Sequence, residues 1–152
     1  PPLEPYIEVL SVLLREAKAV NLPVALHAVH DKAAKVFELL QCETVRKAHF
    51  HWLKADNGTL EAIIEAEYVV SVTPEVCYRQ RDQVLASRVP LDLLMLETDG
   101  PWPFSGPFQG IETTKMFLEK SVRKIADLKD ISIEKAKKQI RVNTQNFYRL
   151  LK

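Results

Sequence analysis

Apolar and polar positions follow two periods along this chain, one typical of helices and one typical of short strands. Residues 4–20 carry apolar side chains three and four positions apart, which predicts an amphipathic helix. Four short apolar runs rich in β-branched residues begin near Pro23, Val45, Glu67 and Leu91, and each predicts a strand. Helical periods separate these runs in residues 31–41, 56–66 and 78–88.

The alternation of strands and helices predicts a parallel sheet. The strands begin about 22 to 24 residues apart, which is typical of right-handed βαβ units. After the fourth strand, a Gly- and Pro-rich loop leads to a long helix expected from about Ile111 to Leu128. Two shorter helices are expected to follow, the first beginning at Ser132. Since no internal boundary or low-complexity segment is evident, we expect residues 1–152 to form a single α/β domain.

Composition and charge place the chain among ordinary globular proteins. It has 152 residues, is 47% hydrophobic and 27% charged, and carries a net charge of +1, which by itself does not indicate nucleic-acid binding. Cys42 and Cys77 lie far apart, which argues against a zinc finger or disulfide framework and favours a reducing compartment. Without a membrane-length apolar run or a secretory signal pattern, a cytoplasmic protein is expected. The first residue is not Met, so processing and origin in a longer chain both remain open.

Polar side chains stand where the predicted strands end. His27 comes late in the first strand, His51 late in the second, and Asp99 ends the fourth within LLMLETDGPWP. Ligands of parallel α/β sheets bind at the carboxyl ends of the strands, so these three side chains could converge. Imidazole and carboxylate together suit zinc, manganese or iron, or a pair of such ions. The pattern therefore predicts a metal site.

Each of these residues also has a purely structural interpretation. A single strand-end histidine is more often structural, and His49 and His51 share one side of their strand, so at most one of them is expected to be a ligand. Asp99 before Gly-Pro could form a turn, and Glu97 could do no more than orient it. Trp102 lies in the loop that follows, where it could stack on a substrate. The structural interpretation must nevertheless explain three coincidences at once.

Four stretches of the sequence follow motifs of one enzyme family in order. They are NLPVALHAVHD, HFHWLKAD, LLMLETDGPW and VNTQNFYRLL. They resemble the Leu-Pro-Val-x-x-His, His-x-Phe-x-Gly, Leu-Leu-x-Glu-Thr-Asp-x-Pro and closing Asn-x-x-x-Leu-Phe segments of the TatD-like metal-dependent deoxyribonucleases, which are amidohydrolase-type (β/α)8 barrels. The third stretch is the most specific, and the fourth places the family asparagine at Asn146.

The resemblance implies a role for each matched residue. His27 and His51 would bind one of two divalent ions (Mg, Mn or Zn), and catalytic Asp99 would bind the other or hold the attacking water. The ions would lower the pKa of that water and neutralise charge on a phosphodiester oxygen, so that DNA is hydrolysed. Weaker candidates for substrate contact are Trp102, Arg79 and His49.

Departures from the family pattern imply an incomplete barrel. The family's His-x-His and bridging Glu have no counterpart, Ala55 replaces a Gly, and Val29 stands where an Arg is often found. A (β/α)8 barrel needs about 200 residues or more, so four strands are expected to be the carboxyl-terminal half of a TIM barrel. Such a half exposes an open core. We therefore expect it to be nearly inactive alone and to associate with the missing amino-terminal half or with another chain.

Two other functions remain open at this point. Fold and metal site do not fix the substrate, so a related barrel hydrolase could act on a small ester or amide. A barrel half could also serve as a non-catalytic interaction module. Support for DNA from charge is thin: Arg79, Arg81 and Arg88 flank the exit of the third strand, while the basic stretch KSVRKIADLK is better explained as a solvated helix face.

Overall fold

A computed structural model describes residues 2–150, which form two compact units. The first unit extends to Val69 and the second begins at Val70. Pro1, Leu151 and Lys152 lie outside the described residues, so the last leucine of the VNTQNFYRLL stretch does as well.

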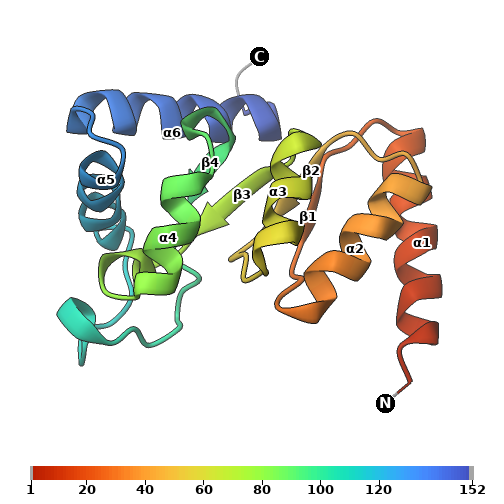
Figure 1. The fold of residues 1–152 in the computed structure, drawn as a ribbon, viewed down its shortest axis with the longest axis horizontal. Helices are drawn as coiled ribbons and strands as arrows, with labels where there is room; N and C mark the ends of the chain where they lie inside the picture. Colours follow the sequence, from red (N-terminus) through yellow and green to blue (C-terminus); the bar gives the residue numbers. More distant parts are fainter. Residues whose placement is uncertain (1, 151–152) are drawn as a thin grey trace. The chain divides into compact units, whose positions relative to one another are not determined.

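The described residues of the first unit form three helices and two strands (Figure 1). Its elements are α1 (Glu4–Ala19), β1 (Val24–Leu26), α2 (Asp31–Cys42), β2 (Ala48–Phe50) and α3 (Asn57–Glu65). β1 and β2 pair in parallel, with Leu26 opposite Phe50. The helices and strands predicted for this half of the sequence are therefore confirmed.

The core of the first unit lies where its helices cover the strands. Leu14, Leu40, Phe50 and Ile63 are almost completely buried. Tyr68 closes this core, because its hydroxyl donates a hydrogen bond of 2.6 Å to the carbonyl of Val45. A buried tyrosine generally requires such a partner for its hydroxyl.

The described residues of the second unit form the other strand pair, whose first residue Val69 still belongs to the first unit, and three helices (Figure 1). Its elements are β3 (Val69–Val72), the 3-10 turn η1 (Pro74–Cys77), α4 (Gln80–Arg88), η2 (Leu91–Leu93), β4 (Leu94–Leu96), η3 (Gly106–Phe108), α5 (Phe117–Leu128) and α6 (Ile133–Tyr148). β3 and β4 are parallel, with Val72 opposite Leu96. The chain is thus α/β with parallel strand pairs, as the sequence predicts.

The carboxyl-terminal helices differ from the expectation in length and number. α5 begins at Phe117 rather than at Ile111, because residues 111–116 form a loop that ends in a turn: the Thr113 hydroxyl donates to the carbonyl of Trp102, and the Thr114 hydroxyl accepts from the N–H of Met116 at 3.3 Å. The last 16 helical residues form one continuous helix, α6, rather than two shorter ones. Ser132 does cap its start, since the Ser132 side chain accepts a hydrogen bond of 3.2 Å from the backbone N–H of Lys135.

One buried asparagine ties α6 to the start of β4. The side-chain amide of Asn143 donates to the carbonyls of Leu91 and Leu94, both at 2.7 Å. Its own oxygen accepts from Gln139, one turn earlier on α6, at 2.8 Å. Asn146, which the family motif singles out, is instead exposed. In the part of the chain that the structure describes, no helix has both the length and the apolar content needed to cross a membrane.

Candidate functional site

His27 and His51 are brought together by the register of the first strand pair. His27 follows β1 directly and His51 follows β2, and their neighbours Leu26 and Phe50 lie opposite each other. The backbone N–H of His51 donates to the carbonyl of Leu26 at 3.0 Å, which continues the strand ladder by one residue. The centres of the two imidazole rings are 5.3 Å apart, and their planes are inclined at 48°.

The spacing of the two rings fits a shared metal ion. An ion with tetrahedral geometry and metal–nitrogen distances of about 2.1 Å would hold two ring centres roughly 5 Å apart. His27 is exposed and His51 is half-buried, so an ion could reach both from solvent. Among residues 2–150, no group of three or more His, Cys, Asp and Glu side chains gathers as a complete ligand set. The pair offers two of the four ligands that zinc usually takes.

His49 lies behind His51 on the same side of β2. Its ring centre is 6.4 Å from that of His51, with the two planes nearly perpendicular. Only 6% of His49 is exposed, and burial, followed by the neighbouring His51, lowers its pKa from 6.5 to about 4. At neutral pH this imidazole is therefore uncharged. As a candidate for substrate contact, His49 is less accessible than the other two histidines.

Asp99 lies in the second unit, three residues beyond the end of β4. Its φ of 48° is in the left-handed region, which aspartate tolerates better than most residues. Its carbonyl accepts a hydrogen bond of 3.0 Å from the N–H of Trp102 and so closes a turn through Gly100 and Pro101. The turn-forming interpretation is thus correct for the backbone of Asp99, while the metal role of its carboxylate stays a prediction.

Glu97 is held by a buried hydroxyl on the neighbouring strand. Ser71 of β3 is 1% exposed, and its hydroxyl donates to a carboxylate oxygen of Glu97 at 2.8 Å. The N–H of Glu97 also donates to the carbonyl of Val72 at 3.2 Å. Burial and then the charge of Glu97 raise the pKa of Tyr148 near the end of α6. The segment that leads to Asp99 is therefore fixed on the β3 side by side-chain and backbone hydrogen bonds.

Trp102 stands on a loop that is anchored by an aromatic cluster. Phe104, Phe108 and Phe117 are buried, and the ring centres of the last two are 4.3 Å apart. The carbonyl of Trp102 accepts a hydrogen bond from the hydroxyl of Thr113. Half of the Trp102 residue remains exposed, so its ring is accessible for stacking.

Arg79 is the N-cap residue of α4, in the second unit. Its Nε donates to the carboxylate of Glu75 at 2.9 Å, and this partner raises the pKa of Arg79 above its ordinary value. Its side chain is half exposed. The sequence singled out Arg79 for its charge, but gave no indication of its buried partner.

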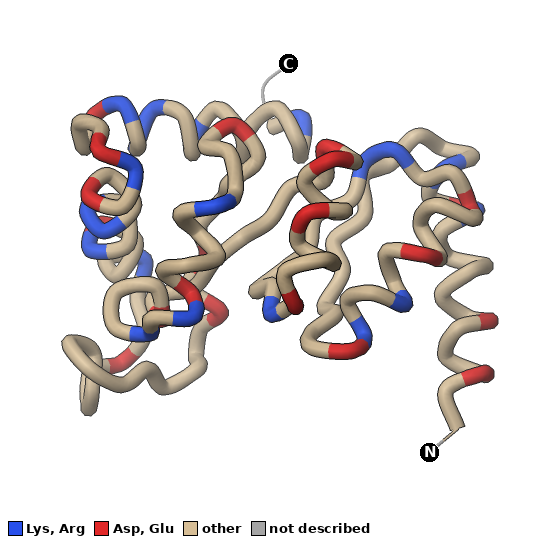
Figure 2. The backbone as a smooth tube through the Cα atoms, viewed as in Figure 1, with Lys and Arg blue, Asp and Glu red and all other residues tan. Residues whose placement is uncertain are grey.

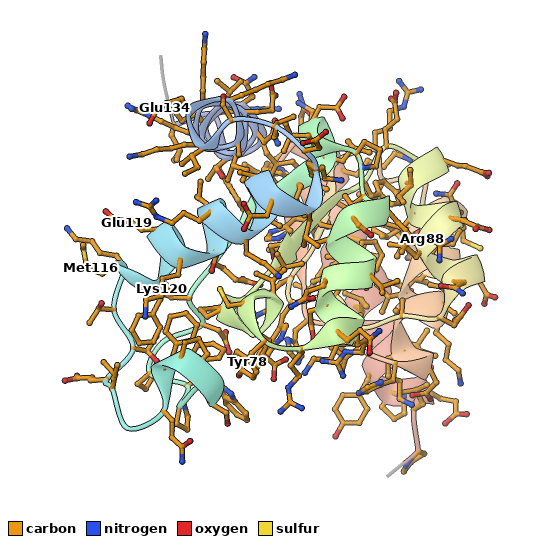
Figure 3. The ribbon with its side chains drawn as sticks, turned by 60° about the vertical axis from the view of Figure 1, so that its left-hand side comes forward. Tyr78, Arg88, Met116, Glu119, Lys120 and Glu134 are labelled. Atoms are coloured by element: carbon orange, nitrogen blue, oxygen red, sulfur yellow. The ribbon has the colours of Figure 1, made fainter. Side chains whose placement is uncertain are left out.

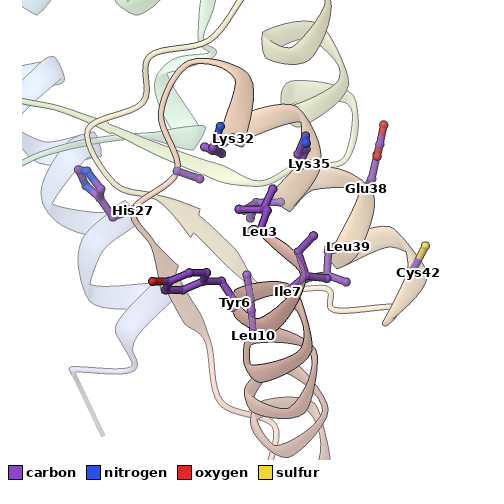
Figure 4. Close-up of a pocket in the computed structure, with 12 residues that line it drawn as sticks. Leu3, Tyr6, Ile7, Leu10, His27, Lys32, Lys35, Glu38, Leu39 and Cys42 are labelled. Atoms are coloured by element: carbon purple, nitrogen blue, oxygen red, sulfur yellow. The ribbon is translucent and has the colours of Figure 1, made fainter. Parts of the chain in front are cut away.

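An apolar groove adjoins His27 in the first unit. It has a volume of about 700 Å³ and lies between α1 and α2, with His27 toward one end and Cys42 toward the other (Figure 4). Apolar side chains from both helices form its walls, among them Leu3, Tyr6, Ile7, Leu10, Val36 and Leu39. Sequence reasoning missed this groove. The available signal was the apolar surface of α1, which is wider than one helix face, since Val9, Val12 and Leu13 are exposed on it.

Comparison with known proteins gives one consistent result. The family model described as TatD related DNase matches residues 1–149. An uncharacterized metal-dependent hydrolase of Haemophilus influenzae is 38% identical over 146 residues, covering 96% of this chain and 57% of its own length. The uncharacterized metal-dependent hydrolase YcfH of Escherichia coli K12 is 28% identical over 137 residues, covering 88% of this chain and 50% of its own length. The chain therefore spans about half the length of the curated relatives it matches.

Two solved structures share the fold. A hydrolase TatD family protein from Entamoeba histolytica has a TM-score of 0.78 at 15% identity, covering 93% of this chain and 55% of its own. YJJV, a TatD homolog from Escherichia coli K12, has a TM-score of 0.76 at 22% identity, covering 90% of this chain and 53% of its own. At these identities the likeness establishes the fold alone, which is of the TIM-barrel type that the sequence predicts.

Proposed function

Because the chain belongs to the TatD-related DNase family, we propose that it is a metal-dependent hydrolase that cleaves phosphodiester bonds in DNA. The observation that carries the proposal is the pair His27 and His51, two imidazoles at neighbouring strand ends with ring centres 5.3 Å apart. The relatives that are named metal-dependent hydrolases support a divalent ion and a hydrolytic reaction.

Each candidate site residue has a proposed role in this reaction. His27 and His51 would hold one divalent ion, and Asp99 would hold a second ion or orient the attacking water. A divalent ion, when bound, would lower the pKa of a water molecule that it holds and would offset negative charge on a phosphodiester oxygen. His49 is uncharged and packs beside His51, so it would keep that ring in place. Trp102 would offer its exposed face to a base of the substrate.

The apolar surface of α1 supports a partner for the first unit. Tyr6, Val9, Val12 and Leu13 are each more than half exposed, and the groove of about 700 Å³ opens beside them. Contiguous exposed apolar surface of this kind usually marks an interface. We propose that this surface is covered by a segment equivalent to the part of the relatives that this chain does not match. The chain alone would then be the carboxyl-terminal half of the barrel and nearly inactive, and robust hydrolysis by it would contradict this assignment.

Metal binding tests the proposal without requiring activity. Isothermal titration with MnCl2 or ZnCl2 should detect a site in the unaltered chain and not in His27→Ala or His51→Ala. His30→Asn is the matched control, because His30 is an exposed histidine of the same unit and asparagine tolerates a positive φ, here 55°, better than most residues do. Equal metal affinity in all four proteins would contradict the proposed ligands.

Substrate class is then tested with paired substrates. The chain, combined with the equivalent amino-terminal segment of the Haemophilus relative, should hydrolyse single-stranded DNA in the presence of the metal that it binds. Hydrolysis of p-nitrophenyl acetate without hydrolysis of DNA would instead support a hydrolase of small esters. An absence of both metal binding and hydrolysis would favour a non-catalytic interaction module.

A further inference from the structure

We propose that Arg79 and Arg81 form a binding site for a phosphate group of single-stranded nucleic acid, and that two buried carboxylates hold them ready for it. The site lies wholly in the second unit and needs no metal ion. The inference rests on the proposed function only in its choice of nucleic acid as the ligand.

The two arginines line a polar pocket of about 460 Å³. Tyr78 and Arg79 lie between η1 and α4, Gln80 and Arg81 begin α4, and Ser105 comes from the loop after β4. β3 and β4 are parallel neighbours, so the pocket lies beyond the carboxyl ends of both strands, where ligands of such sheets bind. Each lining residue carries a hydrogen-bond donor, and none of these five residues is acidic.

Two carboxylates hold the arginines from the protein side. The carboxylate of Glu75 accepts from Arg79 Nε at 2.9 Å and from Arg81 Nη2 at 3.3 Å, while Asp82 accepts from Arg81 Nη2 at 2.9 Å. Glu75 is 6% exposed and Asp82 is 2% exposed. The side chains of the two arginines are 52% and 50% exposed.

Because the carboxylates are buried and the guanidinium groups are exposed, a ligand in the pocket contacts positive charge. The four charges sum to zero, but the negative ones are buried and the positive ones reach solvent. A buried carboxylate is costly unless it is paired, so Glu75 and Asp82 keep the arginine side chains in fixed positions. An arginine that is already ordered loses less conformational freedom when it binds a phosphate through its planar fork. The pocket therefore presents oriented guanidinium groups to an anion.

The backbone adds to the attraction for an anion. Arg79 is the N-cap of α4, a helix of nine residues, and Gln80 and Arg81 are its first two residues. The N-terminal end of a helix carries partial positive charge that favours phosphate groups. The helix end and the two guanidinium groups thus lie at the same pocket.

Aromatic side chains nearby favour single-stranded nucleic acid as the ligand. The guanidinium carbon of Arg79 is 5.7 Å from the ring centre of Tyr78. Tyr78 packs against the η3 turn (Figure 3), where a Cβ on Gly106 would lie 2.9 Å from the Tyr78 ring. The loop that supplies Ser105 also carries the half-exposed Trp102. Tyr78 thus steadies Arg79, and the exposed Trp102 leaves a ring on the same loop as Ser105. Guanidinium groups combined with an exposed aromatic ring are typical of proteins that bind single strands.

Arg123, Lys137 and Arg141 line a different pocket of this unit, between α5 and α6, whose walls also include Glu119 and Glu134 and several apolar side chains. Lys and Arg residues occur along both helices, with acidic residues among them on α5 and at the start of α6 (Figure 2). Arg123 on α5 is exposed, has acidic residues beside it in this second pocket, and lies in the stretch interpreted from sequence as a solvated helix face. It therefore serves as a control of equal charge in the same unit.

The test measures binding in EDTA, so that hydrolysis cannot contribute. A fluorescein-labelled single-stranded oligodeoxynucleotide is titrated with the chain, and anisotropy is followed at several salt concentrations. Arg79→Gln and Arg81→Gln should each weaken binding about tenfold and reduce the slope of log K against log salt by about 0.7. Arg123→Gln should change the affinity less than about twofold. Inorganic phosphate should compete only at much higher concentration than the oligonucleotide.

Loss of folding is checked by circular dichroism, because each glutamine variant leaves a buried carboxylate with one partner fewer. Arg79→Lys and Arg81→Lys retain the charge and should lose part of the affinity while keeping the salt slope. Equal binding by all variants, or no binding by the unaltered chain, would overturn the inference. Variants that alter binding of inorganic phosphate but not of the oligonucleotide would overturn the choice of nucleic acid.

The experiment separates this inference from the proposed function. Oligonucleotide binding that depends on Arg79 and Arg81, without metal-dependent hydrolysis in the assembled protein, supports the pocket and contradicts the nuclease. Hydrolysis that depends on His27 and His51 but is unchanged in Arg79→Gln and Arg81→Gln supports the nuclease and contradicts the pocket.

Discussion

Replacement of Asn143 by alanine should destabilise the second unit more than any change of an exposed polar residue. The Asn143 side chain bridges α6 and the start of β4, since its amide donates to two backbone carbonyls at 2.7 Å each. Asn143 is 7% exposed and Leu94, which supplies one of these carbonyls, is 0% exposed. Water therefore cannot replace the lost donor at Leu94 without a rearrangement of the core.

The magnitude follows from the two carbonyls. A buried acceptor left without a donor costs about 1 to 3 kcal/mol, and the carbonyl of the half-buried Leu91 should lie at the lower end of that range. We therefore expect Asn143→Ala to lower the free energy of unfolding by about 2 to 4 kcal/mol. That loss is a large fraction of the roughly 5 to 15 kcal/mol typical of a whole domain.

Urea unfolding followed by circular dichroism measures this difference. Asn146→Ala is the control, because Asn146 is exposed one turn later on the same helix and should change stability by no more than about 0.5 kcal/mol. Asn143→Asp tests the direction of the hydrogen bonds. The carboxyl introduced in this variant would face two carbonyl oxygens, which disfavour its charged form and raise its pKa in the folded protein. The stability of the variant should therefore fall as pH rises from about 4 to 7. Equal losses in Asn143→Ala and Asn146→Ala would refute the reasoning.

Three further predictions concern burial, strain and capping. Burial lowers the pKa of His49 to about 4, so the unfolded chain takes up the proton first as pH falls, and stability should be lost below the ordinary histidine pKa of 6.5. In EDTA, His49→Gln should remove up to about 3 kcal/mol of this pH dependence between pH 6.5 and 4, as measured by urea unfolding. Gly106→Ala places a Cβ 2.9 Å from the ring of Tyr78 at a φ of 58°, so the midpoint of thermal unfolding should fall. Gly110→Ala should lower the midpoint less, because the space around Gly110 is open. Ser132→Ala should cost about 1 kcal/mol of unfolding free energy and Ser132→Asp almost none, because aspartate caps a helix as well as serine does.

Much of the fold could be predicted from local patterns. The period of apolar residues located the strands and the helices between them, and Ser132 marked the start of α6 through its capping chemistry. The helix expected from Ile111 begins only at Phe117, because helical spacing does not reveal the side-chain hydrogen bonds of Thr113 and Thr114 that hold the preceding residues in a loop. The break expected within the last helix failed because no residue there stops a helix before Arg149, which adopts the left-handed conformation.

The candidate site divides in the same way. His27 and His51 were predictable because each follows a strand of a parallel pair, and parallel register places such residues side by side. Asn143 was not, because a sequence motif pointed to Asn146 and only packing shows which asparagine faces the core. The buried partners Glu75 and Asp82 were missed because a carboxylate near an arginine in sequence does not reveal which of the two is covered.

By itself, the sequence determined the α/β class, the strand-end histidines and the family, since local periodicity and short motifs encode these directly. The tertiary structure alone decided which polar groups are buried: the neutral His49 behind His51, the amide of Asn143 on two carbonyls, and the carboxylates that hold Arg79 and Arg81. Burial depends on segments far apart in the chain. Charge state and hydrogen-bond strength follow from burial, so they emerge only when those segments have packed.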